Sequence, residues 1–563
     1  MLDVIYRSQR GRACNYSDNG KTLSTPAVLP WGPDSDSCVY DNGTGRTVRI
    51  CGKEVSVDPK FLTTPASGAK SQVMAKDGIA VLRLPVEGNE IIPDDCEVVV
   101  VPNAYEVREN FRSLVDQTVR ARRAAGYGRL LVMLGVADPA NMAFLTYVGV
   151  DAVDESFVRV AGDSGYSTIA EGIMECGKEC SASNCDNLRK EAEKAAVFIR
   201  AGRLRELVDQ RSFATSSGVA ALRIYDSEYY DDEEEGFAVN GVRFSCNTVQ
   251  ALRRPDIVRH EQRMKDWYVP PQHKKVLLLL PCSAKKPYHI SRTHRMFGSA
   301  IHTGPWDTLV HEVIVTSPLG VVPRELDAFY PANAYDIPVT GEWKPEEKAR
   351  IVRMLKDLVS KGKYEKVISH LGEDDELVAE VFDEMTSTSV GDGVSPASLT
   401  NLDNAVRELT KDWKALDWNT DRKESVRSAL MYQFGKEVAD AIMDDDTTAS
   451  GKYPYWKIFR DSYGKKVQLG MLSAERGMFS LSPDGARILA GLGKGLVETT
   501  DDFAVKGSLY AVGVAKADHA IREGDEAVVV YNGVVKGVGV AMMCGAEMEQ
   551  AKRGVAIRMR HAV

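Results

Sequence analysis

The apolar run at residues 276–280, Val-Leu-Leu-Leu-Leu, constrains the fold more than any other feature of the sequence. A strand with apolar side chains on both faces is typical of a parallel sheet that helices cover on both sides. Residues 313–316 and 366–371 predict two more strands, and a helix is expected over 345–361 because this segment begins Pro-Glu-Glu. We therefore predict a doubly wound α/β domain over residues 256–425, with its functional loops at the carboxyl ends of the strands.

The length of 563 residues leaves room for three further domains. Residues 1–255 alternate strands with helices, which predicts a βα-repeat domain that resembles a TIM barrel. Within it, the acidic run at 231–235 is expected to be a solvated surface loop. Residues 426–497 predict a small α+β domain. Residues 498–563 consist of short strands between glycine turns, a pattern that predicts a small β-barrel.

Charge and cysteine content restrict the class of protein. The formal net charge is −9, and phosphate contacts need Lys and Arg, so RNA binding would require a local basic patch. The ten cysteines do not resemble a small disulfide scaffold, and no apolar stretch approaches the roughly 18 residues of a membrane span. The first residues lack the apolar core of a signal peptide. We therefore predict a cytoplasmic protein with no membrane contact.

The loop that follows the strand at 276–280 holds the densest group of reactive side chains. They are Cys282, Ser283, Lys285, Lys286, Tyr288, His289, Ser291 and His294. A thiol at a strand end beside two ammonium groups is expected to have a lowered pKa, which makes Cys282 a candidate nucleophile. Either histidine can then donate or accept the proton. The alternative interpretation is a buried cysteine in a basic loop that contacts phosphate.

Three stretches of this domain resemble the archaeosine synthase family. They are Pro281-Cys282-Ser283 with Lys286-Pro287-Tyr288, Ser291 and His294; residues 317–326; and Tyr330-Pro331-Ala332 with residues 335–343. Residues 149–156 are similar to a stretch of the archaeal tRNA-guanine transglycosylases, and residues 521–530, 533–539 and 553–561 resemble a PUA domain, an RNA-binding module. The resemblance covers nearly the whole chain. It implies a degenerate, TIM-barrel-like transglycosylase domain first, and a pre-PUA domain before the PUA β-barrel.

The family resemblance also implies a substrate and a reaction. The substrate is tRNA that carries 7-cyano-7-deazaguanine (preQ0) at position 15 of the D-arm. The reaction adds the side-chain amine of free lysine to the nitrile carbon and gives an amidine, after which a radical-SAM partner enzyme completes archaeosine. No cofactor is required for this chemistry, and the likeness to transglycosylases implies a homodimer.

Individual roles follow for residues in and near the three stretches. The predicted catalytic set is Cys282, His294, Ser283, Lys286, Tyr288, Ser291 and Asp336, and the predicted substrate-binding set is Arg324, Glu325 and Tyr335. Cys282 forms a thioimide with the nitrile, His294 donates the proton, and the hydroxyl groups orient the base or stabilise the developing charge. Arg324 and Glu325 hold the carboxylate and α-amine of lysine, and Asp336 deprotonates the attacking amine. In the simpler alternative, the amine adds directly and Cys282 only packs.

Two further expectations concern RNA and zinc. The candidates for RNA contact in and near the PUA domain are Lys516, Lys536, Arg553, Arg558 and Arg560. Cys176, Cys180 and Cys185 can hold a structural zinc ion if a fourth ligand joins them. Their spacing is wider than in transglycosylases and this domain has no histidine, so unligated cysteines are the alternative interpretation.

Two other functions compete with this hypothesis. An active tRNA-guanine transglycosylase would exchange the base itself, but it needs a nucleophilic aspartate in the first domain and none is evident. A non-catalytic tRNA-binding subunit would use the first domain only as a scaffold. Such a subunit has no need of a cysteine beside a serine and two histidines, which favours the enzyme.

Overall fold

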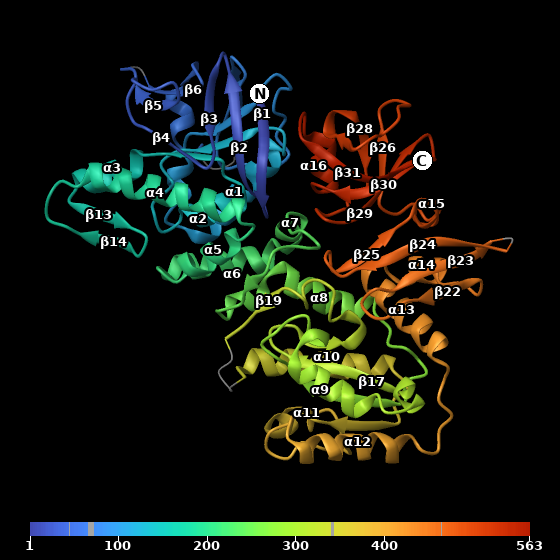
Figure 1. The fold of residues 1–563 in the computed structure, drawn as a ribbon. Coiled ribbons are helices and arrows are strands. Elements are labelled where there is room, and N and C mark those ends of the chain that lie inside the picture. Colours follow the sequence, from blue (N-terminus) through green and yellow to red (C-terminus); the bar gives the residue numbers. More distant parts are fainter. Residues whose placement is uncertain (44, 66–71, 339–342, 463) are drawn as a thin grey trace.

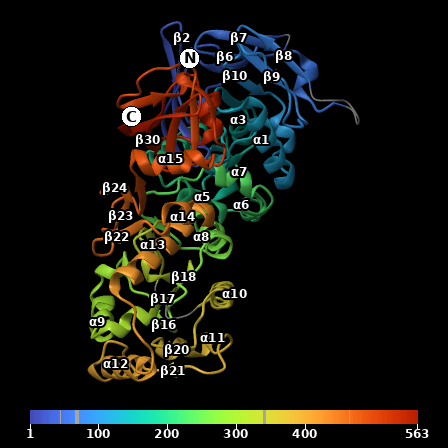
Figure 2. The same ribbon diagram turned by 90° about the vertical axis from the view of Figure 1, so that its right-hand side faces the viewer.

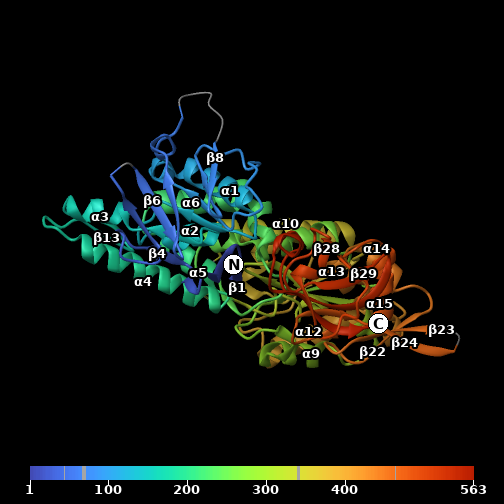
Figure 3. The same ribbon diagram turned by 90° about the horizontal axis from the view of Figure 1, so that it is seen from above.

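The computed structural model describes residues 1–43, 45–65, 72–338, 343–462 and 464–563. In Figure 1 the first domain (blue to teal) and the C-terminal β domain (red) lie side by side at one end of the molecule. The α/β domain (green to yellow) forms the other end, and the orange segment joins it to the C-terminal domain. Figure 2 shows the same two ends from the side, and Figure 3, seen from above, shows the first domain and the C-terminal domain side by side. No helix within the described residues is long and apolar enough to cross a bilayer.

The first domain is built around a six-stranded sheet with the order β4-β12-β11-β10-β9-β8. Its strands are β4 (Ala27–Leu29), β8 (Val73–Lys76), β9 (Ile79–Leu82), β10 (Val98–Val101), β11 (Leu130–Met133) and β12 (Ala152–Asp154). All neighbours are parallel except β8 and β9. Strands β9 to β12 are neighbours in chain order, as in a βα barrel. The sheet is nevertheless open, with edges at β4 and β8, so the predicted barrel is not confirmed.

Helices cover one face of this sheet, and a three-stranded sheet covers the other. The helices of the domain are α1 (Phe111–Ala125), α2 (Met142–Val148), α3 (Ser156–Asp163), α4 (Ser181–Arg200), α5 (Leu204–Ser212), α6 (Ser216–Glu228) and α7 (Tyr230–Glu235), of which α5 and α6 pack in a separate core against α1, α2 and α4. The remaining strands are β1 (Leu2–Ser8), β2 (Gly11–Asp18), β3 (Lys21–Ser24), β5 (Cys38–Asp41), β6 (Arg46–Ile50), β7 (Lys53–Val57), β13 (Tyr166–Ile169) and β14 (Gly172–Glu175). Apolar side chains of α1, α2 and α4 fill one layer, and those of β5 to β7 fill the other.

The acidic run at 231–235 is helical and partly buried, so the prediction of a solvated loop is wrong. It forms most of α7, where the Glu233 side chain is 1% exposed. Glu233 accepts a hydrogen bond at 2.7 Å from Arg205, which is itself fully buried and also pairs with Asp226 at 2.8 Å. A buried carboxylate needs such a partner. No local pattern reveals it, because Arg205 lies 28 residues away in the chain.

The α/β domain contains a five-stranded sheet with the order β18-β17-β16-β20-β21. Its strands are β16 (Val276–Pro281), β17 (Val310–Thr316), β18 (Gly320–Pro323), β20 (Lys366–Ser369) and β21 (Thr386–Ser387). Only β17 and β18 are antiparallel. The chain passes from β16 to β17 on one side and later returns to β20 on the other. The carboxyl end of β16 is therefore the topological switch point, where open α/β sheets bind ligands.

Helices cover both faces of this sheet, as predicted. They are α8 (Pro255–Asp266), α9 (Arg292–Ile301), α10 (Pro345–Lys361), α11 (Asp375–Val378) and α12 (Pro396–Thr410). Leu278 and Leu280 of β16 pack with α9 and α12, whereas Leu277 and Leu279 belong to the core that includes α8 and α10. The strand is thus buried on both faces, and α10 spans the residues over which a helix was predicted.

Two small units complete the chain. The orange segment contains α13 (Trp418–Phe434), α14 (Lys436–Ile442), β22 (Thr447–Ser450), β23 (Lys457–Ser462), β24 (Lys465–Ser473), β25 (Met478–Leu481) and α15 (Pro483–Gly491). The C-terminal unit contains β26 (Leu496–Thr499), β27 (Ser508–Tyr510), β28 (Val514–Ala517), β29 (Glu526–Tyr531), β30 (Val534–Ala541), α16 (Gly545–Gln550) and β31 (Val555–Ala562). Its six strands form one sheet with its own apolar core.

Ion pairs join the domains to one another. Arg7 of β1 pairs with Glu547 of α16 at 2.8 Å. Glu234 of α7 accepts hydrogen bonds from Arg259 of α8 and from Arg522 of the C-terminal unit, at 2.6 and 2.8 Å. A single carboxylate therefore links the first domain, the α/β domain and the C-terminal domain.

Candidate functional site

Three neighbouring parallel strands each deliver a polar side chain to one edge of the α/β sheet. Cys282 follows β16, Thr316 ends β17, and Asp374 lies in the 3-10 turn Gly372–Asp374 that follows β20. Carboxyl ends of adjacent parallel strands meet at one edge, which explains why these residues converge. We use the name Cys282 group for Cys282, Lys286, Tyr288, Thr316, Tyr335 and Asp374.

Two buried phenols and one hydroxyl form the inner wall of the Cys282 group. The hydroxyls of Tyr288 and Tyr335 are hydrogen-bonded to each other, and both bond to Thr316, at 3.2 Å in the case of Tyr288. Burial raises the pKa of both phenols above the usual range. They therefore stay protonated at neutral pH, and their hydrogens are used within the group, where Tyr288 donates to Thr316 and Tyr335 bonds to both.

Tyr335 is held in place by the first part of the chain. It begins the short strand β19 (Tyr335–Asp336), which pairs in parallel with β15 (Phe244–Ser245). Cys246 follows β15, and its amide donates to the carbonyl of Asp336 at 2.8 Å. The residues just before α8 therefore fix one wall of the site.

The electrostatics of Cys282 differ from the prediction of a lowered pKa. Burial raises the pKa of the Cys282 thiol, and the opposing effects of the Lys286 ammonium and of Thr316 do not cancel it. Burial also lowers the pKa of Lys286, whose Nζ lies 4.2 Å from the centre of the Tyr335 ring. The prediction was wrong because it counted the nearby cation and left out the loss of solvation. The two shifts bring thiol and amine closer in acidity, so a proton passes between them more readily.

Asp374 is a member of the group that the sequence analysis missed. Burial raises the pKa of its carboxyl, although a hydrogen bond from Trp343 opposes the shift. Its charge acts on Cys282, raising the pKa of the thiol. The adjacent Asp375 instead accepts hydrogen bonds from Ser369 and Ser387. A signal for Asp374 was present in the sequence, because the acidic stretch 373–376 follows the predicted strand at 366–371.

His294 lies between the Cys282 group and a second set of charged residues, because its ring centre is 5.1 Å from that of Tyr288 while its Nδ1 faces Arg324. We use the name His294 group for His289, His294, Glu312, Arg324 and Asp327. The Nδ1 of His294 lies 2.9 Å from Nη2 of Arg324, which also donates to Glu312 at 2.7 Å. Burial, and then the Arg324 charge, lowers the pKa of His294 to about 3. The imidazole is therefore neutral at physiological pH, and its remaining N–H is too weakly acidic to serve as a general acid, so the structure does not support its predicted role as proton donor.

Ser291 is used by the helix that follows it. Its side chain caps α9 by accepting a hydrogen bond at 3.1 Å from the amide of His294. Serine is a preferred residue at this position because its oxygen satisfies an otherwise unpaired helix amide. The predicted role of Ser291 in orienting the base is therefore replaced by a structural one. Ser283 remains half-buried at the site edge, where it donates to the carbonyl of Lys285 at 3.1 Å.

Arg324 and Glu325 have internal partners, so the structure does not support their predicted contact with free lysine. Arg324 donates to Glu312 and to Asp327, at 2.7 and 3.1 Å. Glu325 accepts from Tyr268 at 2.7 Å and lies 3.3 Å from His311. Arg324 and Glu325 both line a cavity of about 780 Å³ between α9 and the orange segment. Other members of the His294 group line the same cavity.

Asp336, the predicted base, pairs with Arg243 at 3.2 Å, and the Arg243 side chain is largely exposed while that of Asp336 is about half exposed. Exposed pairs of this kind contribute about 0–1 kcal/mol, so Arg243 can leave without a large cost. The last predicted family stretch, 335–343, includes residues 339–342, which lie outside the described part of the chain.

The predicted RNA contacts divide into free and occupied side chains. Arg560 pairs with the buried Glu526 and donates to the carbonyl of Leu481 at 2.8 Å, so it joins two domains instead of facing solvent. Lys536 pairs with Asp502 at 2.6 Å. The other three candidates are exposed, and their side chains form no hydrogen bond or ion pair with any described residue; they are Lys516, Arg553 and Arg558.

Only two of the three predicted zinc ligands are brought together. The sulfurs of Cys176 and Cys180 lie 2.7 Å apart at the start of α4, but Cys185 is 2% exposed and belongs to the apolar core of the first domain. Over the described ranges, no group of three or more His, Cys, Asp or Glu side chains is placed to hold a metal ion. The donor set therefore does not fit a structural zinc.

Three segments of the chain match known protein families. Residues 257–406 match a domain of unknown function, DUF5591. Residues 424–493 match the patch-forming domain C2 of tRNA-guanine transglycosylase, and residues 499–563 match the PUA domain. The Cys282 group lies in the first of these matches, apart from the domains that take their names from RNA modification and RNA binding.

Several archaeal proteins are similar over most of the chain. Archaeosine synthase subunit alpha of Thermoplasma acidophilum is 32% identical over 84% of this chain and 89% of its own length. The protein of the same name from Methanosarcina acetivorans is 34% identical over 83% and 79%. A tRNA-guanine(15) transglycosylase of Methanothermobacter thermautotrophicus is 26% identical over 82% and 70%.

Proposed function

The chain belongs to the archaeosine synthase family of tRNA-modifying transferases, and from that membership we propose that it adds lysine to preQ0 at position 15 of tRNA. The side-chain amine of free lysine attacks the nitrile carbon and gives an amidine. A radical-SAM partner enzyme then removes the lysyl part to leave archaeosine. The observation that carries the proposal is the Cys282 group, which places a thiol, an amine, two phenols and a carboxyl at the switch point of the α/β sheet.

The first step of the proposed reaction is covalent. The Cys282 sulfur bonds to the nitrile carbon while the thiol proton passes, through Lys286, to the nitrile nitrogen. The product is a thioimide, in which one C–N π bond has been replaced by a C–S bond and an N–H bond. As charge develops on the nitrogen, the hydroxyl of Tyr335 exchanges its hydrogen bond within the group for one to that nitrogen, while Tyr288 keeps its bond to Thr316. The opposite pKa shifts of Cys282 and Lys286 support this proton path.

The second step exchanges sulfur for nitrogen. The lysine amine bonds to the thioimide carbon, the C–S bond breaks, and the proton released by the amine returns to Cys282. Asp374 accepts that proton in transit, because a carboxyl whose pKa is raised by burial is a stronger base than an exposed one. Asp336 lies at the more open side of the site and orients the substrate amine. The reaction balances without a redox or metal cofactor.

The tRNA is held by parts of the chain outside this site. A base in the folded RNA must leave its stack before the nitrile can reach Cys282, which costs a few kcal/mol. The exposed cations Lys516, Arg553 and Arg558 of the PUA domain offset this cost by binding phosphates. A homodimer, as in transglycosylases, would present two such surfaces to solution.

The test is to incubate the protein with preQ0-containing tRNA and isotopically labelled lysine, then to digest the tRNA and weigh its nucleosides. A nucleoside heavier by one lysine is expected. Base exchange into unmodified tRNA, with no lysine adduct, would overturn the proposal and assign transglycosylase activity to the first domain. Rapid denaturation during turnover, followed by mass analysis of the peptide with Cys282, separates the covalent route from direct addition. Only the covalent route leaves the deazaguanine attached to that peptide.

A further inference from the structure

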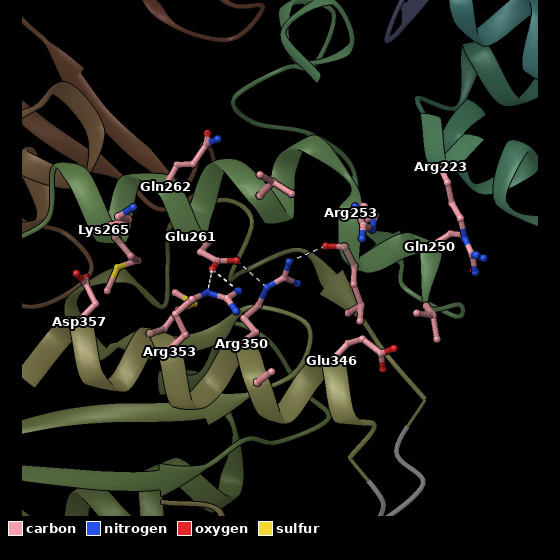
Figure 4. Close-up of a pocket in the computed structure, with 16 residues that line it drawn as sticks. Arg223, Gln250, Arg253, Glu261, Gln262, Lys265, Glu346, Arg350, Arg353 and Asp357 are labelled. Carbon is pink, nitrogen blue, oxygen red and sulfur yellow. Dashed lines mark hydrogen bonds and ion pairs between the residues drawn. The ribbon is translucent and has the colours of Figure 1, made fainter. Parts of the chain in front are cut away.

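A groove of about 1000 Å³ lies on the outer side of the α/β domain, between α8 and α10 (Figure 4). One end is bordered by α6 and by the 3-10 turn Gln250–Arg253, which belong in sequence to the first domain. The groove is separate from the Cys282 group, and none of its lining residues was singled out by the sequence analysis.

Cations outnumber anions among the charged residues that line this groove, by five to three. Its charged residues are Arg223, Arg253, Lys265, Arg350 and Arg353 against Glu261, Glu346 and Asp357. Glu261 pairs with both Arg350 and Arg353, at 2.8 and 2.5 Å, and Asp357 pairs with Lys361 outside the groove at 2.7 Å. In a chain with a net charge of −9, this excess of positive charge is a local exception.

Three of these cations have no partner in the part of the chain that the structure describes. The side chains of Arg223, Arg253 and Lys265 are exposed and form no hydrogen bond or ion pair there. Figure 4 shows Arg223 and Arg253 toward one end of the groove and Lys265 toward the other, with the Glu261 pairs between them. A ligand with negative charges spread along its length would meet two free arginines against the carboxylate of Glu346 at one end and Lys265 at the other.

Arg350, a residue of the groove wall, connects the groove to the Cys282 group through hydrogen bonds to the backbone. Arg350 donates to the carbonyl of Pro318 at 3.0 Å and to that of Leu252 at 2.9 Å. Pro318 lies two residues beyond Thr316, which bonds to the two phenols of the Cys282 group. The groove therefore borders the same edge of the α/β domain as the site.

We propose that this groove binds the sugar–phosphate backbone of the tRNA substrate, next to the nucleotide that enters the Cys282 group. Guanidinium groups match phosphate oxygens because they can donate two parallel hydrogen bonds, and an extended chain of phosphates fits cations at both ends of a groove. The identity of the RNA rests on the proposed function, whereas the binding of a polyanion rests on the groove alone.

The test measures binding of a tRNA transcript to the full chain at several salt concentrations, by fluorescence anisotropy. The variant Arg223→Ala/Arg253→Ala is compared with Lys190→Ala/Arg200→Ala on α4, where the same charge is removed from exposed side chains that lack ion pairs. Loss of two phosphate contacts is expected to weaken binding and to reduce the slope of log affinity against log salt by about 2. The α4 variant should keep the slope of the unchanged protein.

Turnover separates this inference from the proposed function. If the groove variant shows the reduced slope and no preparation adds lysine to tRNA, the groove assignment stands and the proposed reaction fails. If lysine is added but the groove and α4 variants have the same slope, the groove assignment is overturned. In a last check, unlabelled tRNA competes with labelled polyglutamate for binding to the unchanged protein. A groove that binds polyglutamate but not tRNA would belong to an acidic protein partner and would also overturn the proposal.

Discussion

The Cys282 group and the His294 group both draw residues from the loop after β16, but they differ in whether their charged side chains form ion pairs. In the His294 group, Arg324 bonds to Glu312 and Asp327, and Asp327 also bonds to His289 at 2.8 Å. In the Cys282 group, Cys282, Lys286 and Asp374 form no ion pair with described residues, and burial displaces the pKa of each. Satisfied charges hold the loop in place, whereas unsatisfied ones with displaced pKa values are available for reaction.

The sharpest test of this contrast is Cys282→Ala. Turnover should fall roughly 10⁴-fold or more, because the covalent step is lost while the rest of the site remains. Affinity for tRNA, measured by anisotropy, should not change. Ser283→Ala is the matched control, since it removes a neighbouring oxygen that bonds only to Lys285, and it should cost far less. Turnover that survives in Cys282→Ala would favour direct addition of the amine.

Arg324→Met should act on stability instead. It removes the guanidinium that bonds to both Glu312 and Asp327, and leaves Glu312 with His302 at 3.4 Å and Asp327 with His289 at 2.8 Å. Loss of these charge-assisted hydrogen bonds is expected to lower the free energy of unfolding by about 2–3 kcal/mol. Urea unfolding followed by circular dichroism measures this change. Arg295→Met, an exposed neighbour on α9, should stay near the unchanged value. An equal effect of both variants would show that the His294 group holds nothing in place.

Asp374→Asn tests whether the missed carboxyl takes part in the reaction. It keeps the shape of the side chain and removes the base, so turnover should fall by roughly 10²-fold. The loss should appear in the lysine-dependent step, measured with the thioimide already formed. Glu373→Gln, the exposed neighbour, should have little effect. Similar losses in both variants would mean that only the local negative charge matters.

The smallest expected effect concerns His294 and pH. The folded protein holds this imidazole neutral down to about pH 3, whereas the unfolded chain takes up a proton near pH 6.5. Its contribution to stability is therefore present above about pH 6.5 and is lost as pH falls toward 3. Between pH 6 and 5, the stability of His294→Gln should depend on pH less steeply, by up to about 1.4 kcal/mol per unit. Identical slopes would contradict the lowered pKa.

The sequence identifies the elements of the site better than the directions of its side chains. Residues 276–280 predict β16 because a strand buried on both faces has one characteristic composition, and α10 is predicted because its first turn carries a proline and two acids. Periodicity does not show that Ser291 caps α9, nor that His294, one helical turn later, faces Arg324 instead of Cys282. That direction depends on where the helix begins, within one residue.

Long-range partners account for most of the other differences. Thr316 and Asp374 join Cys282 only because β17 and β20 flank β16, an order that no single segment encodes. Arg324 has the right chemistry for a carboxylate, and it does bind carboxylates, but they belong to the protein. Likewise, the burial of Glu233 in the acidic run follows from Arg205, on another helix. Residue chemistry was predictable in these cases, while the identity of the partner was not.

The pairing of β15 with β19 has a consequence for any attempt to reduce this protein to its reactive part. A fragment that starts at α8 contains every member of the Cys282 group, yet it lacks the strand that positions Tyr335. Its β19 would become a free edge, open to pairing with a second molecule, and the phenol would lose its anchor. A fragment that keeps the Cys282 group intact must therefore start upstream of Phe244. The stretch between the first two domains therefore supports the wall of the site that contains Tyr335, and it cannot be shortened as a flexible linker could.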